Sequence, residues 1–193
     1  MVRGFKTKAE KRSLALRQEL GLKFNDPVDC LQLAKHIGIC VLQIDSLCKC
    51  GLSDKDLNVF SSSGNGYNEF SATILHTEHG NILVFNHFHS QVRINSSIAH
   101  EISHIDCEHD FSSMPTGGNF GLIREFPKEC EEEANWLSGC ILIPRSGLVW
   151  AARSGMEIPE IAEHFNTSEE MARWRYNTTG FAAQMKRASK FRN

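Results

Sequence analysis

The residues best suited to chemistry are two histidines, His100 and His104, with Glu101 directly after the first. Residues four apart on an α-helix differ by only about 40° in direction, so the two imidazoles project from one face, one turn apart. They can therefore offer two nitrogen ligands to one metal ion. An H-E-x-x-H pattern on a helix is typical of zinc peptidases, in which the glutamate is the general base. The pattern predicts zinc ligands at His100 and His104 and a catalytic base at Glu101.

An acidic run on a later expected helix offers a third ligand, and catalytic zinc usually takes three ligands from the protein. The run consists of Glu131, Glu132 and Glu133. Because three successive helical residues cannot face one point, only one of them should bind the metal. We expect Glu131, because Asn135 lies four residues further on the same face and could hydrogen-bond a ligand histidine. Glu133 is the alternative ligand.

A rival third ligand stands closer to the histidine pair in the sequence. Asp110 lies ten positions after His100, where metzincin-like enzymes carry their third ligand, and His109 stands beside it. That arrangement needs glycine where this chain has Cys107, because the backbone must turn sharply there. We therefore expect the third ligand on the later helix and a buried thiol at Cys107.

The seven cysteines do not have the spacing of a second metal site. Cys48 and Cys50 are separated by one residue and lack a second pair, which is a poor zinc-finger pattern. Their odd number and irregular spacing also argue against a secreted disulfide framework. We therefore expect free thiols.

Helices and strands are expected where hydrophobic residues recur with the matching period. The pattern predicts helices over about residues 7–20, 27–38, 91–108, 128–142, 146–153, 159–165 and 168–176. It predicts strands over residues 39–44, 70–77 and 82–86, the last two joined by a turn around residues 79–81. The polar and glycine-rich stretches 45–68 and 110–127 are expected to be loops.

The whole chain, residues 1–193, is expected to form one α+β domain. Its 193 residues and 41% hydrophobic composition suffice for one core rather than two. A small antiparallel or mixed sheet should pack on the helices that carry the histidines and the glutamates. Short helices over residues 145–193 would form a C-terminal extension.

Composition limits the classes of partner. The net charge of −2 and the pI near 6.5 provide no general field for attracting a phosphate backbone, so direct nucleic-acid binding is not expected. No stretch approaches the ~18 apolar residues of a membrane span, and residues 1–6 lead into a charged helix rather than a signal-peptide core. We therefore expect a cytoplasmic protein without a membrane partner.

The two helical motifs together resemble those of the ImmA/IrrE family of metallo-endopeptidases, which are bacterial and phage regulators. In that family, H-E-x-x-H is followed by E-x-x-A-N and a hydrophobic run that ends in proline. Here the second motif begins at Glu131, continues through Asn135 and ends at Pro144. Arg93 also stands where the family usually has arginine, and a looser likeness extends over most of the chain.

The resemblance implies a minimal thermolysin-like (gluzincin) fold and a zinc ion, Zn2+, held by His100, His104 and Glu131. It also implies a protein substrate, namely a helix-turn-helix repressor that silences phage, mobile-element or stress-response genes. Glu101 would take a proton from the attacking water and later deliver it to the leaving amine. The strand around residues 82–85 is expected to pair with an extended substrate.

Some roles stay open at this level. Tyr67, Arg175 and Tyr176 are conceivable oxyanion donors, and the sequence favours none of them. A DNA-binding regulator is an alternative function, because residues 158–168 have a spacing faintly like a helix-turn-helix core. Packing of a C-terminal helical cap explains the same apolar spacing. A zinc-sensing regulator with little peptidase turnover is a further alternative, because a family likeness does not guarantee activity.

Overall fold

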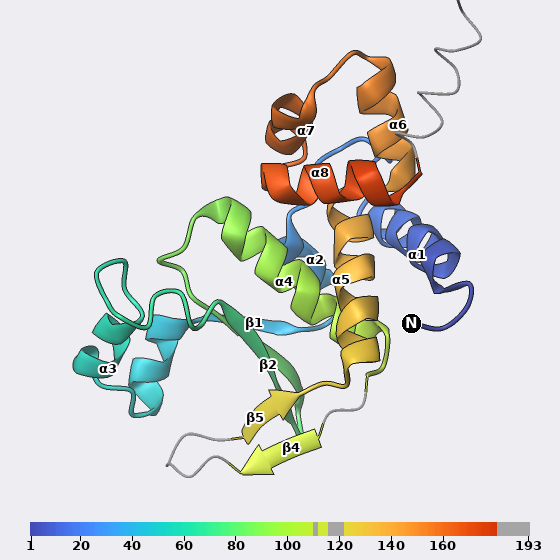
Figure 1. Ribbon diagram of the computed structural model, residues 1–193. Helices are drawn as coiled ribbons and strands as arrows, with labels where there is room; N and C mark the ends of the chain where they lie inside the picture. The colour runs from blue at the N-terminus through green and yellow to red at the C-terminus, as the bar shows by residue number, and fades with distance from the viewer. Residues whose placement is uncertain (110–111, 116–121, 181–193) are drawn as a thin grey trace, which may run out of the picture.

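Two long helices, α4 (Gln91–Asp106) and α5 (Lys128–Leu142), form the centre of the molecule. The structure, a computed structural model, describes residues 1–109, 112–115 and 122–180, with side chains for residues 1–109 and 126–180. A three-stranded sheet lies on one side of α4, and three short C-terminal helices lie on the opposite side (Figure 1). This α+β arrangement confirms the predicted fold class.

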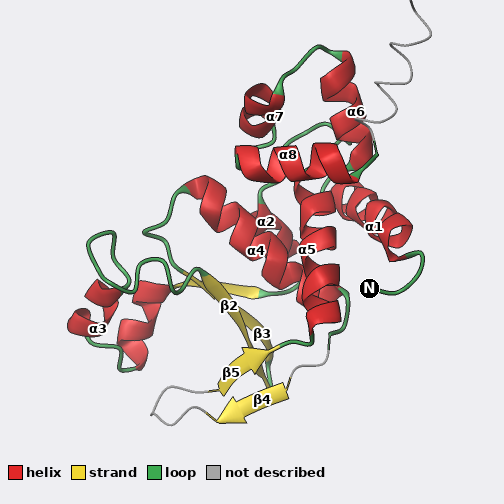
Figure 2. Cartoon of the chain, in the orientation of Figure 1, coloured by secondary structure: helices red, strands yellow, loops and turns green. Residues whose placement is uncertain are grey.

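The remaining elements follow in chain order, as Figure 2 shows by type. The first half contains α1 (Phe5–Glu19), α2 (Cys30–His36), β1 (Cys40–Gln43), the 3-10 helix η1 (Ile44–Cys50), α3 (Asp54–Val59), β2 (Ala72–Thr77) and β3 (Gly80–Phe85). The second half adds β4 (Ser112–Pro115), β5 (Leu122–Glu125), α6 (Arg145–Arg153), α7 (Ile158–His164) and α8 (Glu169–Thr178). Both long helices therefore stand where the hydrophobic pattern predicts them.

The main sheet is mixed, with strand order β1-β3-β2. β3 pairs in parallel with β1 and antiparallel with β2, to which it is joined by a tight turn that ends at Gly80, where φ is 119°. The central strand therefore has hydrogen-bond partners on both sides. For this reason the expectation that residues 82–85 pair with a substrate is wrong, and β2 is the edge strand that lies against α4.

Two stretches expected to be loops contain regular structure. Residues 45–68 include most of η1 and all of α3, and residues 110–127 include the antiparallel pair β4–β5. The α3 helix has a capping box in which Ser53 and Asp56 bond each other's backbone N–H groups. A helix of six residues with no buried side chain is too short and too polar to produce a hydrophobic period.

The helix expected from Pro27 begins later, at Cys30. Asp29 is the N-cap, and its side chain accepts hydrogen bonds from the N–H groups of Leu31 and Gln32. This aspartate satisfies two of the first N–H groups of α2, which have no intrahelical partner. Asp29 therefore sets the start of the helix, in place of the proline two residues earlier.

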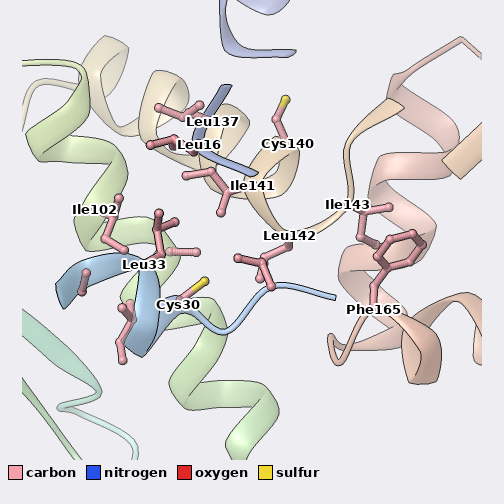
Figure 3. Close-up of a cluster of buried hydrophobic side chains, with 14 of the residues drawn as sticks. Leu16, Cys30, Leu33, Ile102, Leu137, Cys140, Ile141, Leu142, Ile143 and Phe165 are labelled. Carbon is pink, nitrogen blue, oxygen red and sulfur yellow. The ribbon is translucent and has the colours of Figure 1, made fainter. Parts of the chain in front are cut away.

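A continuous hydrophobic core lies between the motif helices and the N-terminal helices. α4 and α5 contribute Ile98, Ile102 and Leu137, all at most 2% exposed. Figure 3 shows side chains of α1, α2, α4 and α5 meeting in this cluster. Burying one such side chain contributes about 1.5–3 kcal/mol to the free energy of unfolding. The core thus fixes the relative position of the two helices that carry the predicted site.

One buried polar side chain ties α2 to α4. Asn95 is 1% exposed, and its amide donates to Val28 O at 3.0 Å and accepts from Cys30 N–H at 2.8 Å. A buried amide needs such partners, because desolvation without them is costly. The pairing fixes α2 on the side of α4 away from the histidines.

Two buried arginines hold the C-terminal end of α5. Arg17 donates to the carbonyls of Ile141 and Leu142 at 2.8 and 3.0 Å, and Arg175 donates to Ile143 O at 2.9 Å. The last carbonyls of a helix lack intrahelical partners, so cationic donors stabilise this end. α1 and α8 are thereby anchored to the same helix end.

The apolar residues that gave residues 158–168 their helix-turn-helix spacing belong to the core. Ile161 and Phe165 are fully buried and Ala162 is 4% exposed. These side chains pack α7 against the rest of the molecule, and this packing explains their spacing. In the parts of the chain that the structure describes, no helix combines the length and apolar character of a membrane span.

Candidate metal centre

The α4 helix places His100 and His104 on one face. It begins at the N-cap Ser90, whose hydroxyl accepts from Arg93 N–H, and its opposite face is buried through Ile94 and Ile98. With that face fixed in the core, the two imidazoles lie toward α5 and β2. The side chain of His104 is 5% exposed and that of His100 26% exposed, so the pair spans the boundary between core and solvent.

The α5 helix brings Glu131 to the two histidines. Glu131 lies in its first turn, and the carboxylate reaches both rings: Oε2 lies 3.3 Å from His100 Nε2 and Oε1 lies 3.4 Å from His104 Nε2. The two Nε2 atoms are themselves 3.1 Å apart. Among the described residues, these three form the one cluster with metal-ligand geometry.

The separations match what zinc requires of its ligands. Two ligand atoms at about 2.0–2.1 Å from a tetrahedral zinc ion lie about 3.4 Å apart. The observed separations between donor atoms, 3.1, 3.3 and 3.4 Å, are close to this value. Two imidazole nitrogens and one carboxylate are also the donor set of thermolysin-type catalytic zinc. The residues present therefore fit a zinc ion with one open coordination position.

Each histidine has further contacts that orient its ring. The side chain of Asn135 lies where it can hydrogen-bond the ring of His100. The ring of His104 stacks on Phe126, with centroids 3.7 Å apart and an interplanar angle of 20°. Burial lowers the pKa of His100 below its usual 6.5, although Glu131 and Asn135 act in the opposite direction. A lowered pKa favours the neutral imidazole, which is the form that binds a metal.

Glu101 lies between two cavities on the open side of the histidines. One cavity, of about 240 Å³, is lined by Glu101 and His104 together with Ile74 of β2 and Phe126. The other, of about 290 Å³, is lined by Glu101 and His100 together with residues at the start of β2. Glu101 therefore lines two cavities that both border on the edge strand.

Arg93 fixes the start of β2 relative to α4. Its guanidinium donates to Ser71 Oγ at 3.2 Å and to Asn68 Oδ1 at 2.7 Å. This contact gives a structural role to the arginine that stands seven residues before His100. The strand that borders the two cavities is thus held by the same helix that carries the histidines.

Several other candidates lie elsewhere. Arg175 is fully buried against Glu10, and neither Tyr67 nor Tyr176 is among the described residues that line the two cavities beside Glu101. Asp110, the rival third ligand, lies outside the residues that the structure describes. Glu133, the alternative ligand, binds His109 and does not join the donor cluster.

Two residues contact His104 although no such contact was expected from the sequence. Phe126 stacks on its ring, and His109 Nδ1 lies 3.1 Å from its Nδ1. Phe126 stands in a stretch expected to be a loop, where no period relates it to α4. His109 stands beyond the end of α4, so helical spacing cannot place it.

Comparison with known proteins gives a match at the level of the family. No curated protein matches the chain. A solved structure described as a Mycobacterium tuberculosis transcriptional regulator is similar, with a TM-score of 0.46 and 16% sequence identity, over 89% of this chain and 46% of that chain. The chain therefore spans less than half the length of that regulator.

The family model is that of Peptidase M78, described as the IrrE N-terminal-like domain, and it matches residues 53–177. The matched range is more than half of the chain and contains both motif helices. The sequence thus matches a metallopeptidase family whose expected ligand residues meet in one cluster of the fold. The chain belongs to the Peptidase M78 family, the family of IrrE-like metallopeptidases.

Proposed function

We propose that the protein is a zinc-dependent endopeptidase, with zinc held by His100, His104 and Glu131 and with Glu101 as the catalytic base. The observation that carries the proposal is the convergence of two imidazole nitrogens and one carboxylate at 3.1–3.4 Å. This donor set leaves one position for water or substrate. Membership of a metallopeptidase family supports the same chemistry.

The residues of the site have distinct tasks in this proposal. Bound zinc would supply Lewis acidity, which polarises the scissile carbonyl and makes water a better nucleophile. Glu101 takes a proton from the attacking water and delivers it to the leaving amine. Asn135 keeps the ring of His100 oriented through its hydrogen bond. The protein's own residues thus hold the metal, orient the ligand rings and transfer the proton.

The exposed edge of β2 is the proposed docking strand for the substrate. β2 pairs with β3 along one edge, and its residues border both cavities beside Glu101. An extended peptide can add to such an edge through backbone hydrogen bonds, with alternate side chains pointing into neighbouring pockets. A peptide bond of the added strand would then lie alongside Glu101.

A helix-turn-helix repressor is the proposed substrate, and its removal would induce phage, mobile-element or stress-response genes. The support for this step is the resemblance to the ImmA/IrrE family, whose members act on such repressors. A cytoplasmic location is part of the same proposal, because the target binds DNA.

The proposal is tested by cleavage of the repressor encoded beside this gene. Purified protein is mixed with that repressor, with and without a chelator, and the products are mapped by mass spectrometry. We expect one metal-dependent cut. Glu101→Gln should slow the cut by about 10²–10⁴-fold, because a general base contributes that much. Zinc content should not change, because Glu101 is not one of the three ligands.

Two results would contradict the proposal. Cleavage by correctly folded, metal-free protein would exclude zinc catalysis. Cleavage by the Glu101→Gln protein at the wild-type rate would show that Glu101 is not the catalytic base. Tight zinc binding without any cleavage would instead favour the alternative of a zinc-sensing regulator with little turnover.

A further inference from the structure

The chain folds back on itself directly after α4. Cys107 is the C-cap, Glu108 has a φ of 54°, and the N–H groups of Glu108 and His109 bond the carbonyls of Ile105 and His104. These two bonds form a Schellman motif, which usually has glycine where this chain has Glu108. The left-handed residue turns the backbone so that the ring of His109 returns to that of His104, with centroids 5.2 Å apart and an interplanar angle of 71°.

His109 is buried between His104 and an acidic residue of α5. Its Nδ1 lies 3.1 Å from His104 Nδ1, and its Nε2 lies 3.4 Å from Glu133 Oε2. The side chains of His109 and Glu133 are only 5% and 13% exposed. Glu133 is held in turn by Val2, whose N–H donates to Oε1 at 2.8 Å. The contacts form a chain of three side chains that ends at His104.

One arrangement of protons satisfies every contact in this chain. A metal ligand at His104 Nε2 requires the proton of that ring to be on Nδ1. His104 Nδ1–H then donates to His109 Nδ1, which places the proton of His109 on Nε2. That Nε2–H donates to the carboxylate of Glu133. The opposite tautomer of His104 would have its proton on the nitrogen that faces His100 and Glu131.

We propose that His109 and Glu133 are positioning residues that fix the tautomer and the ring orientation of His104. The inference rests on the proposed function, because it assumes a metal at His104 Nε2. It gives Glu133 a role different from that of a ligand. The two ligand histidines are then supported separately, His100 by Asn135 and His104 by the pair of His109 and Glu133.

Zinc affinity of the full chain tests this role, measured by competition with a chromophoric chelator. His109→Phe keeps an aromatic ring but neither hydrogen bond, and it should weaken zinc binding by about 10–100-fold, as loss of a group that supports a ligand does. His109→Gln can accept from His104 and donate to Glu133, so it should restore affinity to within a few-fold of wild type. Glu132→Gln removes a neighbouring exposed carboxylate and should have no effect.

Nitrogen NMR of the imidazole rings provides a second measurement that a purely structural role would not change. In the zinc-loaded wild type, His104 should have metal-bound Nε2 and a slowly exchanging proton on Nδ1. In His109→Phe that proton should exchange rapidly. If His109→Phe does not fold, the wild-type spectrum decides alone, because an unprotonated Nδ1 would overturn the inference.

The outcomes separate this inference from the proposed function. Wild-type protein that binds no zinc would refute the metal site, and the positioning role with it. Tight zinc binding by wild type and equally tight binding by folded His109→Phe would overturn the positioning role alone. His109→Gln as weak as His109→Phe would also overturn it, because hydrogen bonding at this position would then not matter.

Discussion

Glu131, Glu132 and Glu133 are identical in chemistry, yet they have three different surroundings. Glu131 contacts both imidazoles, Glu132 is 49% exposed, and Glu133 is buried against His109. The cause is the helix itself, because successive residues differ by about 100° in direction. At the scale of residues, position around the helix therefore decides the role of each glutamate. Glu131 is a candidate ligand, Glu132 is solvated, and Glu133 is a candidate positioning residue.

Glu131→Gln tests the ligand assignment. Replacing the carboxylate by an amide removes the negative charge and the stronger donor, so zinc affinity should fall by more than the roughly 10–100-fold that loss of a supporting group costs. Chelator competition measures the change, and Glu132→Gln, on the next residue, is the matched control. Unchanged affinity in Glu131→Gln would mean that the third ligand lies elsewhere.

At the scale of elements, the predictable parts are those with long hydrophobic periods. α4 and α5 were predicted closely because each has a buried face over 15 or more residues. The predicted start of α2 at Pro27 is wrong because the N-cap is Asp29, whose side chain accepts hydrogen bonds from the first free N–H groups of the helix. α3 and β4–β5 were missed because short polar elements depend on local hydrogen bonds rather than on a period.

The same distinction between predictable and unpredictable parts applies to the site. Helical spacing places His100 and His104 on one face of α4, and Glu131 and Asn135 on one face of α5. The contact of His109 with His104 does not follow from helical spacing, because it depends on a left-handed residue, Glu108, where glycine is usual. Sequence patterns thus place residues within helices better than residues just beyond them.

Gly139 is a position where α5 and α8 approach closely. A Cβ atom there would lie 2.5 Å from Trp174 Cζ3 and 2.9 Å from Arg175 Cδ, both in α8. Gly139→Ala should therefore lower the free energy of unfolding by about 1–3 kcal/mol, as overpacking does. Chemical denaturation measures the change.

The matched control introduces the same residue on the exposed side of the same helix. Glu132→Ala also adds alanine to α5, at a side chain that is 49% exposed and whose carboxylate lies 3.6 Å from the N-terminal amino group. Because exposed ion pairs contribute little, it should change stability by at most about 0.5 kcal/mol. A Gly139→Ala protein as stable as this control would show that α8 does not pack against α5 as described.

At the scale of the whole molecule, the candidate metal centre joins α4 to α5, the two helices around which the other elements pack. The ends of these helices away from the site are held by the core and by Arg17 and Arg175. A metal ion would connect the remaining ends. Binding to the folded state alone stabilises that state by mass action.

Removal of zinc should therefore lower the melting temperature. Free zinc at 100 times its dissociation constant adds about 2.7 kcal/mol to the free energy of unfolding. For a chain of this size, this corresponds to a rise in melting temperature of roughly 5–10 °C. Calorimetry with and without chelator measures the shift. A double variant that lacks both histidines, His100→Ala with His104→Ala, should show no shift on addition of chelator. A shift of equal size in that variant would place the stabilising metal elsewhere.

X-ray absorption at the zinc edge tests the central claim most directly, because it reports the ligands of the metal in the purified protein. The account predicts one zinc per chain, with two imidazole nitrogens at about 2.0–2.1 Å, oxygen as the remaining donor and no sulfur. Sulfur at about 2.3 Å would mean that cysteines bind the metal. That result, or protein that takes up no zinc, would contradict the account.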